Sequence, residues 1–310
     1  MVRFLLRRVI GASAVLIAVS LMAYSLIYLA PGDPATIILA RQIGRLPSPE
    51  QVASLSAQYG LDKPLVVQYF NWVIQALHGD FGYSIRTKNP IVKEASSRFS
   101  VTLLVASLTM IGAVIIGIPT GLLAAWRKNT LLDHATRAVA LLAVAIPDFW
   151  LGFLLVFAFS VSLHWLPSHG IGSPKHMILP VICLLVANSA RLSRLTRSGM
   201  LEVEREKYLL GARAKGLTRR AAWVRHGFPN AAVPLVTLIA AMFSVTIAST
   251  IIIETMFALP GIGYYFLQAV NYRDIPVIQA LVVLYGAVFM FFSLVADIAY
   301  VMIDPRIRLD

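Results

Sequence analysis

Few residues of this chain carry groups that could do chemistry, and three histidines are the most concentrated of them. His164, His169 and His176 lie in one short stretch that also contains Gly and Pro. Imidazoles are common ligands of transition metals, but spacings of five and seven residues match no recognised metal-binding pattern. We interpret them as surface histidines and predict no metal site. The single cysteine, Cys183, excludes an intrachain disulfide and a thiolate cluster.

Two carboxylates stand inside or at the end of long apolar runs. If those runs cross a membrane, Asp148 and Glu254 are expensive to bury and are functional candidates for that reason. Glu254 precedes "LPGIG" (259–263), where Pro260 and Gly261 suit an irregular turn that lines a cavity. We predict that these four residues line a polar path, with a re-entrant outer gate at 259–263. The alternatives are a structural bond from Asp148 to a neighbouring helix, and a plain outer turn.

The composition shows which solvent surrounds these residues. The 310-residue chain is 58% hydrophobic and 14% charged, whereas a soluble domain has about 25% charged residues. This indicates a polytopic membrane protein in a lipid bilayer. A net charge of +12 would suggest nucleic acid as the partner of a soluble protein. In a membrane protein it reflects basic cytoplasmic loops, so we expect no nucleic acid.

Six apolar segments are long enough, or nearly so, to cross a bilayer core, which takes about 20 helical residues. They span residues 9–30, 101–126, 138–163, 177–190, 231–253 and 275–296. The third is interrupted by Asp148, and the fourth is short before Arg191 unless that arginine reaches back to the interface. In "GIPTG", Gly117 and Gly121 form a small-xxx-small pattern that favours close helix packing. We predict an all-α integral membrane fold with six transmembrane helices.

The distribution of Lys and Arg predicts the orientation. With the N-terminus inside, the inner segments hold 18 Lys and Arg, and the short outer loops 164–176 and 254–274 hold 2. Because positive charge concentrates on cytoplasmic loops, both termini are expected in the cytoplasm. The first apolar run is longer than the apolar core of a signal peptide, so we expect an uncleaved span.

The predicted outer loop, residues 31–100, is too long for a simple connector. "SPEQVASLSAQYG" predicts a helix with Ser48 as N-cap and Gly60 as its stop. "DKPLVVQYFNWVIQALHG" predicts a second helix, from near Pro64 to near Gly79, with an apolar face. That face comprises Val66, Phe70, Val73 and Leu77. "NPIVKEASSRF" opens a third helix. We predict a helical outer subdomain that either docks an external partner or shields the bundle.

The loop 191–230 concentrates positive charge on the cytoplasmic side. Five basic residues and no acid fall within 211–229: Arg213, Lys215, Arg219, Arg220 and Arg225. Gly216 predicts a break between two short helices, and Pro229 is expected to end the second. On these grounds alone, an interfacial amphipathic helix near anionic lipid remains an alternative.

The loop also resembles a known family signature. "LGARAKGLTRRAAWVRHGFPNAAVPL" is similar to the cytoplasmic loop of type I ABC importer permeases, with Gly216 and Pro229 at the signature Gly and Pro. Leu210, Gly211 and Ala212 replace its EAA, and His226 and Phe228 replace its Ile and Leu. "ARAKGL" is typical of the dipeptide, oligopeptide and nickel branch. The following stretches agree along nearly the whole chain: "LAPGDPA", "YGLDKPLVVQY", "GDFGYS", "IPDFWLG", "ETMFALPGIG", "RDIPVIQA" and "DPRIR".

The resemblance implies an importer permease in which this loop couples to a cytoplasmic ATPase. The implied coupling residues are Ala212, Arg213, Ala214, Lys215, Gly216, Leu217, Arg219, Arg220 and Pro229. The implied partners are a second homologous permease, two ATPase subunits and an external binding protein. The chain lacks G-x-x-x-x-G-K-[ST], so ATP and Mg would be bound by partner subunits. We expect no cofactor in this chain and no enzyme activity of its own.

The expected organisation is a cytoplasmic N-terminus with span 1 (1–30), the outer subdomain (31–100) and a core permease bundle (101–310) in a bacterial plasma (inner) membrane. The implied cargo is nickel, a metal chelate or short peptides. "FWLGFLLVFAFSVSLHWLP" (149–167) resembles nickel-uptake members and favours nickel. The alternative is a secondary transporter or channel without ATP coupling, but we find no internal repeat between 1–163 and 164–310.

Overall fold

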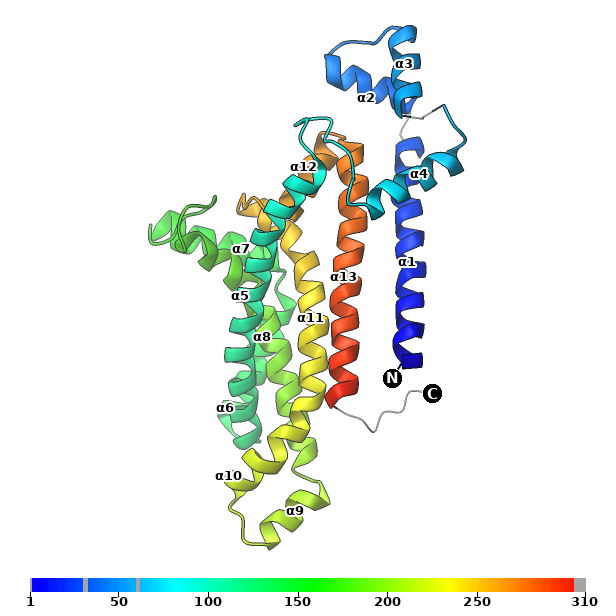
Figure 1. Ribbon diagram of the computed structural model, residues 1–310. Helices are drawn as coiled ribbons and strands as arrows, with labels where there is room; N and C mark the ends of the chain where they lie inside the picture. The colour runs from blue at the N-terminus through cyan, green and yellow to red at the C-terminus, as the bar shows by residue number, and fades with distance from the viewer. Residues whose placement is uncertain (1, 30–32, 60–61, 304–310) are drawn as a thin grey trace. The chain divides into compact units, whose positions relative to one another are not determined.

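The computed structural model describes residues 2–29, 33–59 and 62–303, and in these ranges its regular elements are all helices. Five helices are long and apolar enough to cross a membrane, and a bent pair makes a sixth crossing if it counts as one span. The five are α1 (Val2–Leu29), α5 (Ile91–Trp126), α8 (Lys175–Val203), α11 (Phe228–Met256) and α13 (Ile275–Ile303) (Figure 1). The all-α membrane class is thereby confirmed. "DPRIR" and parts of "LAPGDPA" lie outside the described residues.

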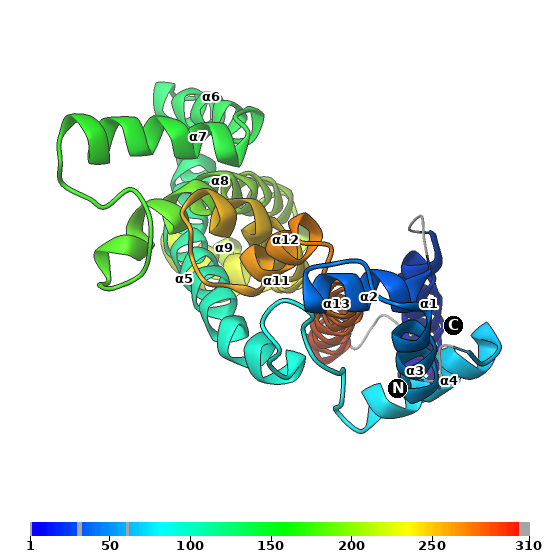
Figure 2. The same cartoon turned by 90° about the horizontal axis from the view of Figure 1, so that it is seen from above.

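The chain divides into two compact units, and the first contains residues 102–260 and the end of α13. Within it, α6 (Leu131–Ala145) and α7 (Asp148–Leu155) meet at an angle of 99°. The π-helical η1 (Val156–Ser162) continues α7, which runs across the direction of α6 (Figure 2). The third predicted segment, 138–163 with its interruption at Asp148, is therefore a bent helix pair whose break lies just before Asp148. Pro147 disfavours the helical conformation in the residue before it, and both Ile146 and Pro147 are extended.

The fourth predicted span was too short, because α8 extends to Val203, well beyond Arg191. It can do so because its arginines are accommodated differently: Arg191 and Arg194 are exposed, whereas Arg197 pairs with Asp133. Helix α8 packs beside α11 in the same unit (Figure 1).

Glycines allow α5 to approach α8 closely, as the small-xxx-small pattern predicts. A Cβ atom added to Gly117 would lie 2.6 Å from the Ser189 carbonyl oxygen. One added to Gly121 would lie 2.5 Å from the Ser193 carbonyl oxygen. Both separations are shorter than carbon and oxygen tolerate, so only glycine fits at this crossing. Thr120, between them, donates to Ser193 Oγ at 3.1 Å.

The second unit contains residues 2–101 and 261–290. Its shorter helices are α2 (Pro34–Ile43), α3 (Pro49–Tyr59), α4 (Leu65–Leu77) and α12 (Ile262–Asn271). Ser48 begins α3 as expected, because its hydroxyl accepts from Gln51 N–H while Gln51 Oε1 accepts from Ser48 N–H. The predicted stop at Gly60 lies outside the described residues. A buried core joins the start of α5 to α12 and α13 through Ile91, Ala95, Ile262, Tyr265, Ala269, Val277, Ala280 and Leu281.

Two expectations for the outer loop need correction or qualification. Residues 91–100 form the first turns of α5 and not a separate short helix, since nothing between Pro90 and Trp126 ends the helix. Helix α4 has its expected bounds, but three members of its predicted apolar face, Val66, Phe70 and Leu77, are exposed. Its buried residue is Gln68, which accepts from the Tyr24 hydroxyl of α1.

Candidate functional site

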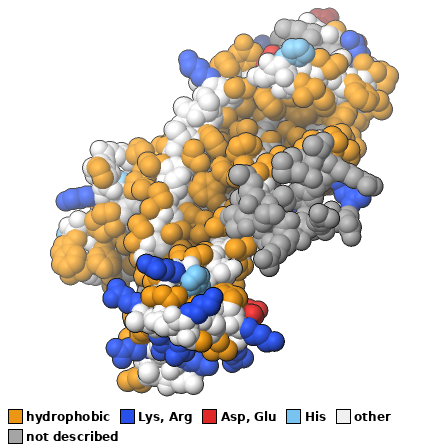
Figure 3. All heavy atoms as spheres, turned by 60° about the horizontal axis from the view of Figure 1, so that its bottom comes forward, with side chains coloured by type: hydrophobic (Ala, Val, Ile, Leu, Met, Phe, Trp, Pro, Cys, Tyr) orange, Lys and Arg blue, Asp and Glu red, His pale blue; other side chains and the backbone are white. Residues whose placement is uncertain are grey.

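The basic loop forms a helical turn that connects α8 to α11. Helix α9 (Lys207–Ala214) is followed by Gly216, whose φ of 94° lies in the left-handed region that favours glycine. Thr218 then caps α10 (Arg219–Ala222), accepting from Ala221 N–H. Helices α9 and α10 lie at one end of the α8–α11 pair (Figure 1), where Lys and Arg side chains gather (Figure 3). The structure thus has the helix break predicted at Gly216.

Arg219 anchors this turn to the bundle. Its Nη2 and Nε donate to Glu204 Oε1 at 2.8 and 3.1 Å. Its guanidinium lies 4.5 Å from the ring centroid of Trp126 and 5.3 Å from that of Trp223, a cation–π arrangement. The two indoles meet edge to face with centroids 5.0 Å apart. Arg219 therefore binds within its own chain.

Apolar side chains pack the turn against α8 and α11. Leu209 of α9 and Ala222 of α10 are buried against Met200 and Val203 of α8 and Ala231 of α11. Burying such side chains stabilises a fold by about 25 cal/mol per Å² of apolar surface. The turn is therefore a packed part of its unit.

Several predicted coupling residues remain at the surface of this packed turn. Arg213, Ala214, Lys215, Gly216 and Arg220 are exposed, and Ala212 and Leu217 are partly buried. The exposed group combines three positive charges with a fixed backbone turn. Such a surface can contact a partner protein, and none of its side chains forms an arrangement suited to catalysis.

Pro229 does not end a helix, contrary to expectation. The helical path continues from Arg219 through the π-helical η2 (Trp223–Gly227) into α11, and Pro229 lies in the first turn of α11. The π-helical η2 ends at Gly227, so Pro229 follows an already widened turn of this path. Asn230 Nδ2 also donates to the His226 carbonyl at 2.7 Å. The wider turn and this bond accommodate the proline.

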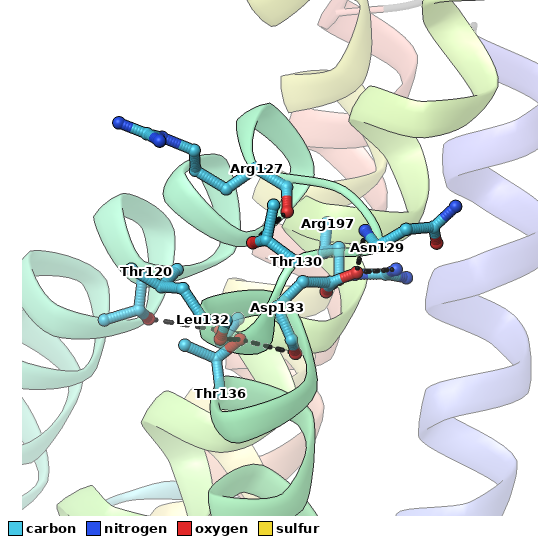
Figure 4. Close-up of polar contacts among 9 residues, drawn as sticks. Thr120, Arg127, Asn129, Thr130, Leu132, Asp133, Thr136 and Arg197 are labelled. Atoms are coloured by element: carbon cyan, nitrogen blue, oxygen red, sulfur yellow. Dashed lines mark hydrogen bonds and ion pairs between the residues drawn. The ribbon is translucent and has the colours of Figure 1, made fainter.

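A buried ion pair links α6 to α8, and sequence reasoning missed it. Arg197 Nε and Nη2 donate to the two carboxylate oxygens of Asp133 at 2.6 and 2.8 Å (Figure 4). Asn129 N–H donates to the same carboxylate at 3.0 Å, and Asp133 is fully buried. A two-pronged Arg–carboxylate pair fixes orientation as well as distance. The sequence shows Asp133 as an acid in the first turn of the helix that follows Thr130, but this pattern does not identify the residue that pairs with it.

The predicted path residue Asp148 is the first residue of α7 and is half-buried. Arg191 of α8 lies near enough for its charge to act on Asp148. Arg191 Nη1 donates to Asn188 Oδ1 at 3.1 Å, and Asn188 Nδ2 donates to Thr246 Oγ1 at 3.2 Å. Asn188 thus links Arg191 of α8 to Thr246 of α11 by hydrogen bonds, and Asp148 at the start of α7 lies within range of the Arg191 charge. Sequence reasoning proposed only Asp148 for the path, because the other three residues lie on two other helices, α8 and α11.

The other path candidates lie near the end of α11. Glu254 is fully buried and accepts from the Thr102 hydroxyl at 2.6 Å. Pro260 is partly buried, and Gly261 is the buried N-cap of α12. A path role for these three residues, and the re-entrant gate, remain predictions.

Two of the three clustered histidines have local partners. His169 shares a hydrogen bond with the Ser168 hydroxyl, and His176 accepts from Ser173 N–H. Among the residues that the structure describes, no three His, Cys, Asp or Glu side chains are grouped so that they could hold a metal ion.

Comparisons with known proteins agree with this arrangement. Residues 117–309 match the family "Binding-protein-dependent transport system inner membrane component", and residues 1–106 match its N-terminal component. A probable peptide ABC transporter permease, y4tP of Sinorhizobium fredii (strain NBRC 101917 / NGR234), is 36% identical and is aligned over 98% of this chain and 99% of its own. Glutathione transport permeases GsiC of Salmonella choleraesuis (strain SC-B67) and Escherichia coli (strain K12) are 37% and 35% identical, each aligned over 99% of both chains.

Solved structures support the fold. The MetNI methionine ABC transporter matches with a TM-score of 0.55 at 17% identity, covering 66% of this chain and 93% of that chain. An amino acid ABC transporter crystallised with histidines matches with a TM-score of 0.52 at 18% identity, covering 67% and 93%.

The fold and the full-length matches define a multi-pass membrane permease of the type I ABC importer class. The chain belongs to the binding-protein-dependent transport system inner membrane component family, in its dipeptide and oligopeptide branch. Permeases of this family are membrane components and are not themselves catalytic.

Proposed function

We propose that this chain forms half of the pore through which an ATP-driven importer carries short peptides, including glutathione-like tripeptides, delivered by an external binding protein. The named cargo of relatives at 35–37% identity supports this class. So does the opposite charge of Asp148 and Arg191, because a peptide carries both an ammonium and a carboxylate. Nickel gains no specific support from these relatives and stays a prediction that the cargo test decides.

The proposed assembly contains this permease, a second homologous permease, two cytoplasmic ATPase subunits and the binding protein, in a bacterial inner membrane with both termini of this chain inside. ATP would close the ATPase pair and bias the permease between inward-open and outward-open states through differential contacts. The observation that carries the coupling role is the exposed basic turn at Gly216, held to the bundle by Arg219.

The contact can be tested by cross-linking. Cys183 is buried and is the chain's only cysteine, so a cysteine introduced at an exposed position is the one accessible thiol. We expect Lys215→Cys in the assembled importer to cross-link to an ATPase subunit. Lys88→Cys, exposed in the predicted outer segment, should not. Equal cross-linking at both positions, or none at Lys215, would contradict the coupling assignment.

The coupling role can be tested by straining the turn. Gly216→Val places a β-branched side chain at a positive φ, where its backbone conformation is strained. Gly44→Val is a matched control with φ of 70° and equally open surroundings. We expect the first variant to lose uptake in proteoliposomes while ATP hydrolysis continues, and the second to transport normally. Deleting 211–220 should have the same uncoupling effect. Full transport by a correctly assembled Gly216 variant would overturn the role.

The cargo assignment needs its own measurement. We expect the binding protein to be stabilised thermally by short peptides or glutathione, and not by nickel salts or metal chelates. With that cargo, Asp148→Asn should raise the concentration needed for half-maximal uptake. Unchanged uptake at every cargo concentration would remove Asp148 from the path. A response to nickel alone would replace the peptide class.

A further inference from the structure

A groove lies beside the basic turn, entirely within the first unit, and Arg220 is the one proposed coupling residue in its lining. Its volume is about 700 Å³, within the range of small-molecule sites. It is lined by Pro119, Leu122, Leu123, Trp126, Met200, Arg220, Trp223, Val224 and Phe228. Eight of these nine side chains are apolar or aromatic, and one is a cation.

The groove lies where apolar helix surface gives way to the basic turn. Trp126 is the last residue of α5, and Trp223 is the first of η2, directly after the basic α10. Tryptophan is enriched at the boundary between bilayer and water because its ring is apolar and its N–H is polar. The pair therefore places the groove at the depth of lipid headgroups.

One end of the groove is positively charged. Arg219 is already engaged by Glu204 and the two indoles, so the charge offered to an occupant is that of Arg220. Arg220 is exposed, and its side chain forms no ion pair or hydrogen bond within the part of the chain that the structure describes. Its preferred ligand is a phosphate or carboxylate, which matches the guanidinium geometry.

Part of the apolar lining of the groove is exposed. Leu123 and Val224 are 46% and 64% exposed. Ile115 and Ile116, about two turns earlier on α5, are 65% and 45% exposed, so the apolar strip continues along the helix in register with Pro119 and Leu123. An occupant that satisfies both the cation and the exposed apolar strip must have an anionic head and a long apolar tail.

We propose that this groove binds one anionic phospholipid, with its phosphate on Arg220, its glycerol region against the contacting pair Trp126 and Trp223, and an acyl chain along α5. The single unpaired cation beside a continuous apolar strip fits a lipid better than a protein partner, which would bring its own polar backbone to the wall.

The test compares an anionic lipid with a zwitterionic lipid that has the same acyl chains. The assembled importer in detergent is titrated with phosphatidylglycerol and with phosphatidylcholine of the same acyl chains, and retained lipid is counted by native mass spectrometry. We expect preferential retention of one phosphatidylglycerol. Arg220→Gln should weaken that retention about fivefold, the factor equivalent to about 1 kcal/mol for one basic group at an anionic surface. Arg220 is exposed, so the variant should fold.

Controls separate this site from general charge attraction. Arg213→Gln removes the same charge from α9, outside the groove lining, and should leave phosphatidylglycerol retention unchanged. Val224→Asp places a negative charge in the groove and should reduce it. Equal retention of both lipids, equal loss in the two arginine variants, or full displacement by inorganic phosphate would overturn the proposal. These readouts do not depend on transport, so they stand apart from the coupling tests.

Discussion

Ser84 and Asp274 lie 190 residues apart in the sequence, yet the Ser84 hydroxyl donates to Asp274 Oδ2 at 2.5 Å within the second unit. The backbone N–H groups of Ile85 and Arg86 donate to the same carboxylate at 3.1 and 3.2 Å. Asp274 is 4% exposed and directly precedes α13. Two sequence stretches, "GDFGYS" and "RDIPVIQA", therefore meet at one buried acceptor.

Replacing this acceptor should destabilise the second unit. Asp274→Asn replaces one of two carboxylate oxygens that together accept from three donors by an NH₂ group, and leaving buried donors unpaired costs about 1–3 kcal/mol each. We expect a lower melting temperature of the purified importer in a thermal-shift assay. Asp62→Asn, at an exposed position, is the control and should melt like the parent. An unchanged melting temperature for Asp274→Asn would show that the three bonds contribute little.

The Asp133–Arg197 pair offers a test by paired substitution. Asp133→Leu alone leaves a partly buried guanidinium without its carboxylate, and breaking a buried pair costs about 3–5 kcal/mol. Adding Arg197→Met replaces both charges by apolar groups and should recover much of the loss. Denaturant unfolding of the two variants measures the recovery. A double variant as unstable as the single one would contradict this interpretation.

The α5–α8 crossing predicts sensitivity to a single methyl group. Gly121→Ala places a Cβ within 2.5 Å of a backbone oxygen that cannot move aside, and overpacking costs about 1–3 kcal/mol. Gly11→Ala, in α1, adds the same methyl group where nothing lies within 4 Å. We expect the first to lower thermal stability and the second to leave it unchanged or raise it. Equal behaviour of the two would show that the helices separate easily.

Arg219 should control the order of the basic turn. Arg219→Gln removes the bond to Glu204 and the stacking on two indoles, worth about 0.5–2 kcal/mol for the cation–π part. Hydrogen exchange of residues 207–222 should become faster. Arg205→Gln removes a neighbouring exposed charge and should not change it. Equal protection from hydrogen exchange in the parent and in both variants would mean that apolar packing alone holds the turn.

The sequence by itself determined the class of protein. A helical membrane permease was predicted from three local signals: the long apolar runs, the excess of Lys and Arg on one set of loops, and the motifs around Gly216. The sequence also predicted three local features: the cap at Ser48, the break at Gly216 and the close helix approach at Gly117 and Gly121. Each depends mainly on the residue type at one position or on a short spacing, so a local pattern is enough to predict it.

Only the tertiary structure decided which residues meet. Asp133 with Arg197, Ser84 with Asp274, and Arg219 with Trp126 each join distant elements, and no spacing in the sequence specifies those contacts. The same limit explains the wrong helix bounds. A helix can continue past a charged residue that has a partner, and α8 continues past Arg197 because Arg197 pairs with Asp133. The α6–α7 segment bends before Asp148 because Pro147 turns the chain there.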